Sequence, residues 1–153
     1  MHILFKTYLE WFKRLHALIA ESVRDLPPTA LDWQPGPDMN SLAVLLAHTA
    51  GAEKYWVCAV AGGDDHGRDR AAEFRTAGAT IDDLLAQLDD TLTAVRATLA
   101  ALQMDDLAQV REAGRNGEAH TVSWALMHAL EHTSLHLGHI HMTRQLWEQA
   151  QAD

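Results

Sequence analysis

The stretch VSWALMHALEHTSLHLGHIHMTRQLWEQ, residues 122–149, decides the fold. Its apolar side chains recur every three or four residues, which is the period of an α-helix. Thr121 stands just before it and is a residue type that caps helix N-termini. Five of the chain's 10 histidines fall between positions 128 and 141 of this helix. The stretch therefore predicts a long C-terminal helix that carries an unusual number of imidazoles on its surface.

Three further amphipathic helices precede this one. The first is expected from about residue 2 to about 25, where Phe5, Leu9 and Phe12 begin a helical repeat. The second runs through SLAVLLAHTAGAEKYWVCAV, with Asn40 or Ser41 as its cap and Gly62-Gly63 as its stop. The third follows Thr80 and continues to Leu102.

Four long helices in a chain of 153 residues predict an all-α protein, a four-helix bundle in one domain. No alternating Val/Ile/Thr-rich run suggests a β-strand. The connections are roughly 14, 17 and 18 residues long, whereas tight bundle turns have 2–8. Connections of this length permit a crossover topology rather than a simple up-and-down one.

Composition excludes several classes of partner. The chain has 12 Lys and Arg against 21 Asp and Glu, a formal charge of −9. Nucleic acid and anionic membranes both require concentrated positive charge, so neither is expected as a partner. The N-terminal stretch is interrupted by charges and does not resemble a signal peptide, and Cys58 has no partner for a disulfide. A cytoplasmic location is therefore expected.

Histidines form a stripe along the C-terminal helix. His132 and His136 lie one turn apart and about 40° apart around the axis, and His128 and His139 extend the same stripe. Ala125, Leu135, Thr143 and Leu146 share it, so it is expected to face the core. Two histidines four residues apart on a helix can clamp a divalent metal.

A third ligand is expected from another helix. His48 lies in the middle of the second helix, on a stripe of apolar residues. Three protein ligands with an open position are typical of a catalytic zinc site, although imidazole also suits nickel, iron and copper. The competing interpretation is a hydrogen-bonded polar core or surface decoration, which a histidine pair at this spacing equally permits.

Longer motifs resemble a known family. NSLAVLLAHTAGAEKYW (residues 40–56), followed by AGG, and VSWALMHALEHTSLHLGHI (residues 122–140) resemble the DinB-like (DinB/YfiT) superfamily, and the likeness spans nearly the whole chain. Its helix-two histidine and its late H…H.GQ motif fall on His48, His132, His136 and Gly138. His139 departs from the pattern, because many relatives have Gln there.

The resemblance implies a single DinB-like four-helix bundle over residues 1–153, with crossover topology and often a homodimer. It implies a metal site made by His48, His132 and His136, usually with zinc or nickel and sometimes with iron. It also implies small-molecule substrates, since characterised members are thiol S-transferases and isomerases that use bacillithiol, mycothiol or glutathione.

Some features allow two interpretations. Leu126, Met127, Leu130 and Leu137 lie away from the histidine stripe and suggest either a dimer interface or packing under a loop. Arg68, Arg70 and Arg75 suggest either binding of an acidic thiol cofactor or a solvated, salt-paired surface.

The sequence leaves open the roles of three further residues near the expected ligands. His128 and His139 are expected to hydrogen-bond the ligands or line the cleft, and Tyr55 to line the cleft or pack in the core. No general acid or base can be assigned.

Three functions remain in competition. The first is a metal-dependent thiol S-transferase, in which a thiolate attacks a small electrophile. The second is a metal-dependent hydrolase, and the third is a non-enzymatic structural or stress-response module that binds metal.

Overall fold

Four long helices make up most of the computed structural model, which describes residues 1–64, 67–113 and 118–152. They are α1 (Ile3–Val23), α3 (Leu42–Lys54), α5 (Ile81–Ala101) and α6 (Val122–Ala152). The short elements are α2 (Pro28–Leu31), a π-helix that continues α3 (Tyr55–Ala61), α4 (Arg70–Glu73), a 3₁₀-helix (Met104–Ala108), β1 (Val110–Ala113) and β2 (Glu118–Thr121). The predicted all-α four-helix bundle is confirmed.

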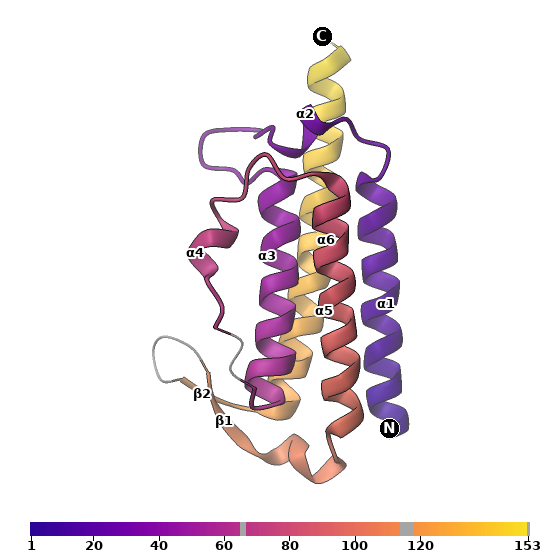
Figure 1. Cartoon of the computed structure of the whole chain (residues 1–153), viewed down its shortest axis with the longest axis vertical. Coiled ribbons are helices and arrows are strands. Elements are labelled where there is room, and N and C mark those ends of the chain that lie inside the picture. The colour runs from indigo at the N-terminus through magenta and orange to yellow at the C-terminus, as the bar shows by residue number, and fades with distance from the viewer. Residues whose placement is uncertain (65–66, 114–117, 153) are drawn as a thin grey trace.

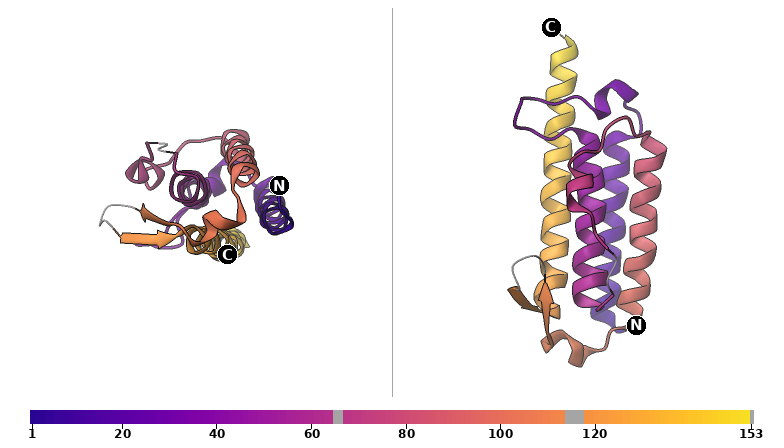
Figure 2. Two further views of the ribbon diagram at one scale, coloured as in Figure 1. Left: turned by 90° about the horizontal axis from the view of Figure 1, so that it is seen from below. Right: turned by 60° about the vertical axis from the view of Figure 1, so that its left-hand side comes forward.

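The helices form a bundle whose chain direction is not simply alternating. Helices α1 and α6 run one way and α3 and α5 run the other way (Figure 1). Helix α1 packs on α5 and α6, and α3 packs on the same two helices, so α1 and α3 are diagonal to each other. Because α3 and α5 are parallel, the connection between them returns along the length of the bundle, and its described part, residues 62–64 and 67–80, lies outside the bundle and carries α4 (Figure 2). This is the crossover that the long connections permitted.

The ends of the helices follow the capping residues in the sequence. Ser41, rather than Asn40, caps α3 by accepting a hydrogen bond from the Val44 amide. Thr80 accepts from Asp83 at the start of α5, and Thr121 accepts from Trp124 at the start of α6. Each cap satisfies one of the amides that a helix leaves unpaired in its first turn.

The buried face of α6 differs from the predicted one. It is centred on Ala129, Thr133 and Ile140, which are almost fully buried, whereas Leu135 is 54% exposed. The expectation that Leu135 faces the core is therefore wrong. Helix α6 contacts both α1 and α3, so the direction of its buried face depends on two neighbours that periodicity alone does not place.

The structure also shows which of the apolar residues away from the histidine stripe are buried. Leu126 and Leu137 belong to the core, and Leu130 packs against it. Met127 is 60% exposed. The three leucines pack in the core of the bundle, rather than at a dimer interface or under a loop, and Met127 is the exposed member of these four residues.

A small antiparallel hairpin was not expected. Strands β1 and β2 pair with Val110 opposite Thr121 and Ala113 opposite Glu118. The expectation of no strands is wrong because this ribbon is held by backbone pairing and buries little, so it needs no alternating apolar pattern. None of the described helices is both long and apolar enough to cross a membrane.

Two neighbouring residues of α6 test where its buried face lies. Leu126→Ala should lower the free energy of unfolding by about 2–5 kcal/mol, because it removes a fully buried side chain. Met127→Ala should change it by less than about 0.5 kcal/mol. Urea denaturation monitored by circular dichroism measures both. Equal losses for the two variants would contradict this assignment of the core.

Candidate metal centre

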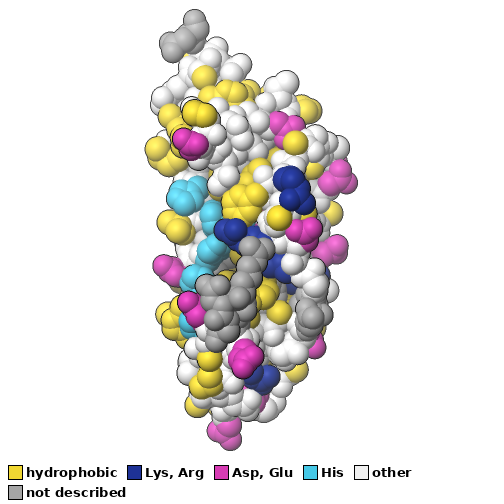
Figure 3. Space-filling model, turned by 90° about the vertical axis from the view of Figure 1, so that its left-hand side faces the viewer, with side chains coloured by type: hydrophobic (Ala, Val, Ile, Leu, Met, Phe, Trp, Pro, Cys, Tyr) yellow, Lys and Arg dark blue, Asp and Glu magenta, His cyan; other side chains and the backbone are white. Residues whose placement is uncertain are grey.

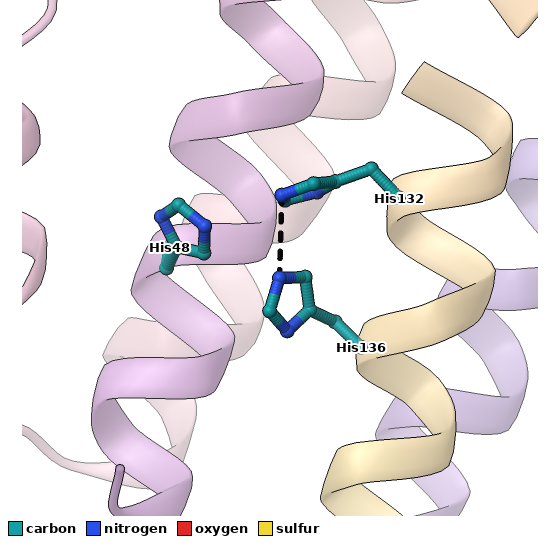
Figure 4. A group of neighbouring side chains, drawn as sticks. All are labelled: His48, His132 and His136. Atoms are coloured by element: carbon teal, nitrogen blue, oxygen red, sulfur yellow. Dashed lines mark hydrogen bonds between the residues drawn. The ribbon is translucent and has the colours of Figure 1, made fainter. Parts of the chain in front are cut away.

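Three histidines from two helices converge at the side of the bundle. His48 on α3 faces His132 and His136 on α6 (Figure 4). The ring of His48 lies 5.0 Å from each of the other two rings, centroid to centroid, and those two are 4.4 Å apart. One nitrogen of each ring lies within 4.8 Å of the others. The structure thus brings together the three residues that the sequence singled out as ligands.

The hydrogen bonds of the rings determine which nitrogen each one can offer. The Nδ1 of His48 lies 2.9 Å from Oε2 of Glu73 and donates to it, which leaves Nε2 free. The Nδ1 of His136 lies 3.4 Å from Nδ1 of His139. The Nε2 atoms of His132 and His136 are 3.2 Å apart. Two nitrogens bound tetrahedrally to one zinc ion are about 3.3 Å apart, so the His132–His136 pair has the spacing of two ligands of such an ion.

Electrostatics keep two of these imidazoles, those of His132 and His136, uncharged. Burial, together with the neighbouring histidines, lowers the pKa of His132 to about 3 and that of His136 to about 4. At neutral pH both rings therefore have a free lone pair. A metal ligand must be deprotonated, and these two need lose no proton to become one.

Glu73 is the important residue that the sequence analysis missed. Its carboxylate accepts from His48 and, through both oxygens, from Arg68 at 2.6 and 2.8 Å. Burial raises the pKa of Glu73, but the hydrogen bonds from Arg68 and His48 outweigh this and lower it overall. Glu73 thus stays ionised and orients the His48 ring, as carboxylates do beside metal-bound histidines.

One sequence signal could have pointed to this contact. Gly51 lies within α3, where glycine costs about 0.5–1 kcal/mol relative to alanine. A Cβ atom at this position would overlap the Glu73 carboxylate. The glycine therefore makes room for a group that arrives from the crossover segment.

The other predicted residues lie around this cluster. The ring of His139 is 5.2 Å from that of His136, and the ring of His128 is 5.8 Å from that of His132. Nδ1 of His128 also lies 3.3 Å from a carboxylate oxygen of Glu131. Both histidines therefore flank the cluster, and neither is among the lining residues of the pocket beside it.

The cluster opens into a pocket of about 510 Å³. Its lining residues are His48, Ala52, Tyr55, Trp56, Arg68, Arg70 and His132. The histidines form a column on this face of the molecule, with basic and apolar side chains beside them (Figure 3). Tyr55 lines the pocket under the Arg68 guanidinium, whose carbon is 5.3 Å from the ring centroid.

The other histidines of the described residues, and the cysteine, take no part in the cluster. His16 is buried against Glu53, with its Nε2 atom 2.9 Å from Oε2 of the carboxylate. His141 bonds Ser22 on α1, and His66 lies outside the described residues. Cys58 is buried, and burial raises the pKa of its thiol, so it is unsuited to act as a nucleophile.

Comparison with known proteins places this site in a family. Residues 7–149 match the model of the family described as mycothiol-S-transferase. The chain belongs to this family. The mycothiol-S-transferase family is DinB-like, so the predicted superfamily is also confirmed.

Solved structures agree with the fold of this mycothiol-S-transferase family member. A conserved protein from Enterococcus faecalis has a TM-score of 0.76 at 18% identity, over 95% of this chain and 97% of that one. YfiT from Bacillus subtilis, described as a probable metal-dependent hydrolase with an unusual four-helix bundle topology, has a TM-score of 0.76 at 15% identity, over 95% and 89%. No curated protein matches the sequence.

Removing the carboxylate behind His48 should weaken metal binding. Glu73→Gln is expected to lower zinc affinity about 10–100-fold, because the ring loses the partner that orients it. Competition with a chromophoric chelator measures the affinity. Glu131→Gln is the matched control, since Glu131 is bonded only to the flanking His128, and it should change little. Equal affinities for Glu73→Gln and wild type would contradict the role of Glu73.

Lowered pKa values also predict the stability of the metal-free protein. An unfolded histidine titrates near 6.5, so the unfolded state binds protons more readily than folded His132 and His136 do. Their contribution to stability is complete above pH 6.5 and is lost as the pH falls towards about 4 and 3. Urea unfolding between pH 7.5 and 4.5 should show this loss. A His132→Gln/His136→Gln variant should lose less stability over the same range, and an unchanged slope would refute the explanation.

Proposed function

We propose that this protein is a metal-dependent thiol S-transferase that uses a low-molecular-weight thiol of the mycothiol type. The observation that carries the proposal is the cluster of three imidazoles, two of which, those of His48 and His132, line a pocket of about 510 Å³. The family match supports a thiol as the cofactor. Bacillithiol and glutathione are the alternative thiols for the same chemistry.

His48, His132 and His136 would hold the metal. Zinc is the first choice, and nickel or iron also suits three imidazoles. A divalent ion in this position lowers the pKa of a bound thiol and so makes a thiolate available at neutral pH. The protein contributes the neutral ligands, the Glu73 carboxylate that orients His48, and a pocket beside them for the second substrate.

The transfer step needs only a nucleophile and a leaving group. The thiol releases its proton to solvent, and a sulfur lone pair forms the new bond to carbon. The leaving group departs with the electron pair of the bond that breaks. Ala52, Tyr55 and Trp56 give the pocket an apolar side that reduces access of water to the electrophile.

Hydrolysis is the second candidate, because YfiT, which shares the fold, is described as a probable metal-dependent hydrolase. Hydrolysis by a metal centre usually needs a general base close to the attacking water. No Asp or Glu side chain is among the lining residues of this pocket in the described part of the chain. This favours the transferase over the hydrolase.

A homodimer is the proposed assembly, with α6 as the contact. Trp124, Met127, Leu135 and Met142 are each more than 40% exposed and recur along this one helix. Most soluble oligomers are symmetric dimers, and a repeated apolar stripe suits such a contact. The location proposed for the protein is the cytoplasm, where low-molecular-weight thiols stay reduced.

Metal content and thiol consumption together test the function. Wild-type protein should carry about one metal per chain and consume mycothiol with a benzylic halide. His48→Ala should lose both, because two ligands rarely retain a divalent ion. His141→Ala, also on α6 but facing Ser22, is the control and should retain both.

Other results of these experiments would favour one of the alternative functions. Turnover of esters or amides without thiol would favour the hydrolase. Metal binding with no turnover, together with a melting temperature that drops on chelation, would favour a structural module.

A further inference from the structure

The pocket is lined by two arginines, and one of them, Arg70, is not paired with a carboxylate in the described part of the chain. Arg68, the other pocket arginine, is held by both oxygens of Glu73. Arg70 has no carboxylate partner within the described part of the chain, although it lines the same pocket. Its guanidinium lies 4.5 Å from the centroid of the Phe74 ring.

This guanidinium is held close to the metal ligands. The Phe74 ring that carries it lies 4.7 Å from the ring of His48, centroid to centroid. Arg70, Phe74 and His48 therefore form a chain of contacts that leads to the ligand cluster, with the Phe74 and His48 rings tilted by 47° to each other. A guanidinium resting on an aromatic face loses less freedom when it binds an anion than one that moves freely in solvent.

Charge around the pocket is opposite to that of the whole protein. The chain as a whole carries −9, yet the pocket lining contains two arginines and no carboxylate. Arg68 is offset by Glu73, and the three imidazoles are neutral ligands, so a bound divalent ion and Arg70 would both remain as positive charges. A pocket lined by one sign of charge concentrates ligands of the other sign.

The wall beside the cluster is apolar. Trp56 packs edge-to-face against Tyr55 at 5.2 Å and against His128 at 4.7 Å, and it lines the same pocket. Such a wall suits a flat hydrocarbon body rather than a strongly hydrated one. The Arg70 guanidinium lines the same pocket and suits a carboxylate.

We infer that the second substrate is a carboxylate-bearing electrophile with an apolar body, and that Arg70 binds its carboxylate. This inference rests on the proposed transferase function and names its substrate class. With a benzylic halide of this class, the thiolate sulfur forms the bond to the benzylic carbon. The carbon–halogen bond breaks, and the halide leaves with the electron pair.

Binding without reaction gives the first test. Isothermal titration calorimetry compares 4-methylbenzoate with the neutral 4-methylbenzamide on metal-free protein. Wild type should bind the acid about fivefold more tightly, and Arg70→Gln should abolish this preference. Arg75→Gln removes the same charge five residues away, outside the pocket, and should leave the preference intact. Because no metal and no turnover are involved, failure of the transferase proposal does not affect this result.

Kinetics give the second test. Zinc-loaded protein with mycothiol should have a kcat/KM about fivefold higher for 4-(bromomethyl)benzoate than for its methyl ester, corrected for the uncatalysed rates. Arg70→Gln should lower the value for the acid and leave that for the ester unchanged. The preference should also shrink in 0.5 M salt, since an exposed ion pair is screened.

Several results would overturn the inference. One is equal binding of acid and amide by wild type. Another is a preference that survives in Arg70→Gln, which would show that a different group holds the carboxylate. A third is an equal loss for acid and ester in Arg70→Gln, which would show that Arg70 only maintains the shape of the pocket.

Discussion

Removal of water from three imidazoles is the constraint on which the site depends. Burial makes protonation of His132 and His136 unfavourable, and each protonated ring would also repel its neighbours. His132 and His136 therefore stay neutral, and their rings face each other and the ring of His48. Each neutral ring keeps one N–H and one lone pair, so a cation between the rings can accept a lone pair from each of them. The folded bundle thus holds these lone pairs close together, in a place where a bound metal ion would stabilise them.

The connection between α3 and α5 supplies the residues that surround His48 and line one part of the pocket. Helices α3 and α6 supply the three histidines, whereas Arg68, Arg70, Glu73 and Phe74 all come from the connection between α3 and α5. A simple up-and-down bundle would join these helices by a short turn at one end. Because α3 and α5 are parallel, the chain must pass along the outside of α3, and there it reaches His48. The crossover topology therefore determines which residues surround His48.

Much of this arrangement could be predicted from the sequence. Helical periodicity and the caps at Thr80 and Thr121 located the long helices, and the spacing of His132 and His136 with the apolar setting of His48 located the cluster. Glu73 could not be found in this way, because its contact spans 25 residues and its segment has no periodic pattern. The π-helix after Lys54 changes backbone hydrogen bonding without a distinctive side-chain pattern. Leu135 was misplaced because a helix between two neighbours buries a face that only the packing defines.

The buried contacts of Glu53 with His16 and Thr133 fix how α6 is aligned with α3 along the bundle axis. Glu53 accepts from His16 on α1 and, at 3.1 Å, from Thr133 on α6. Glu53 lies on the same helix as His48, and Thr133 directly follows His132. If α6 slid along α3 by one turn, about 5.4 Å, a buried carboxylate would lose its hydroxyl donor, which is costly. The same polar contact thus sets the height at which the two ligand-bearing helices face each other, next to the cluster itself.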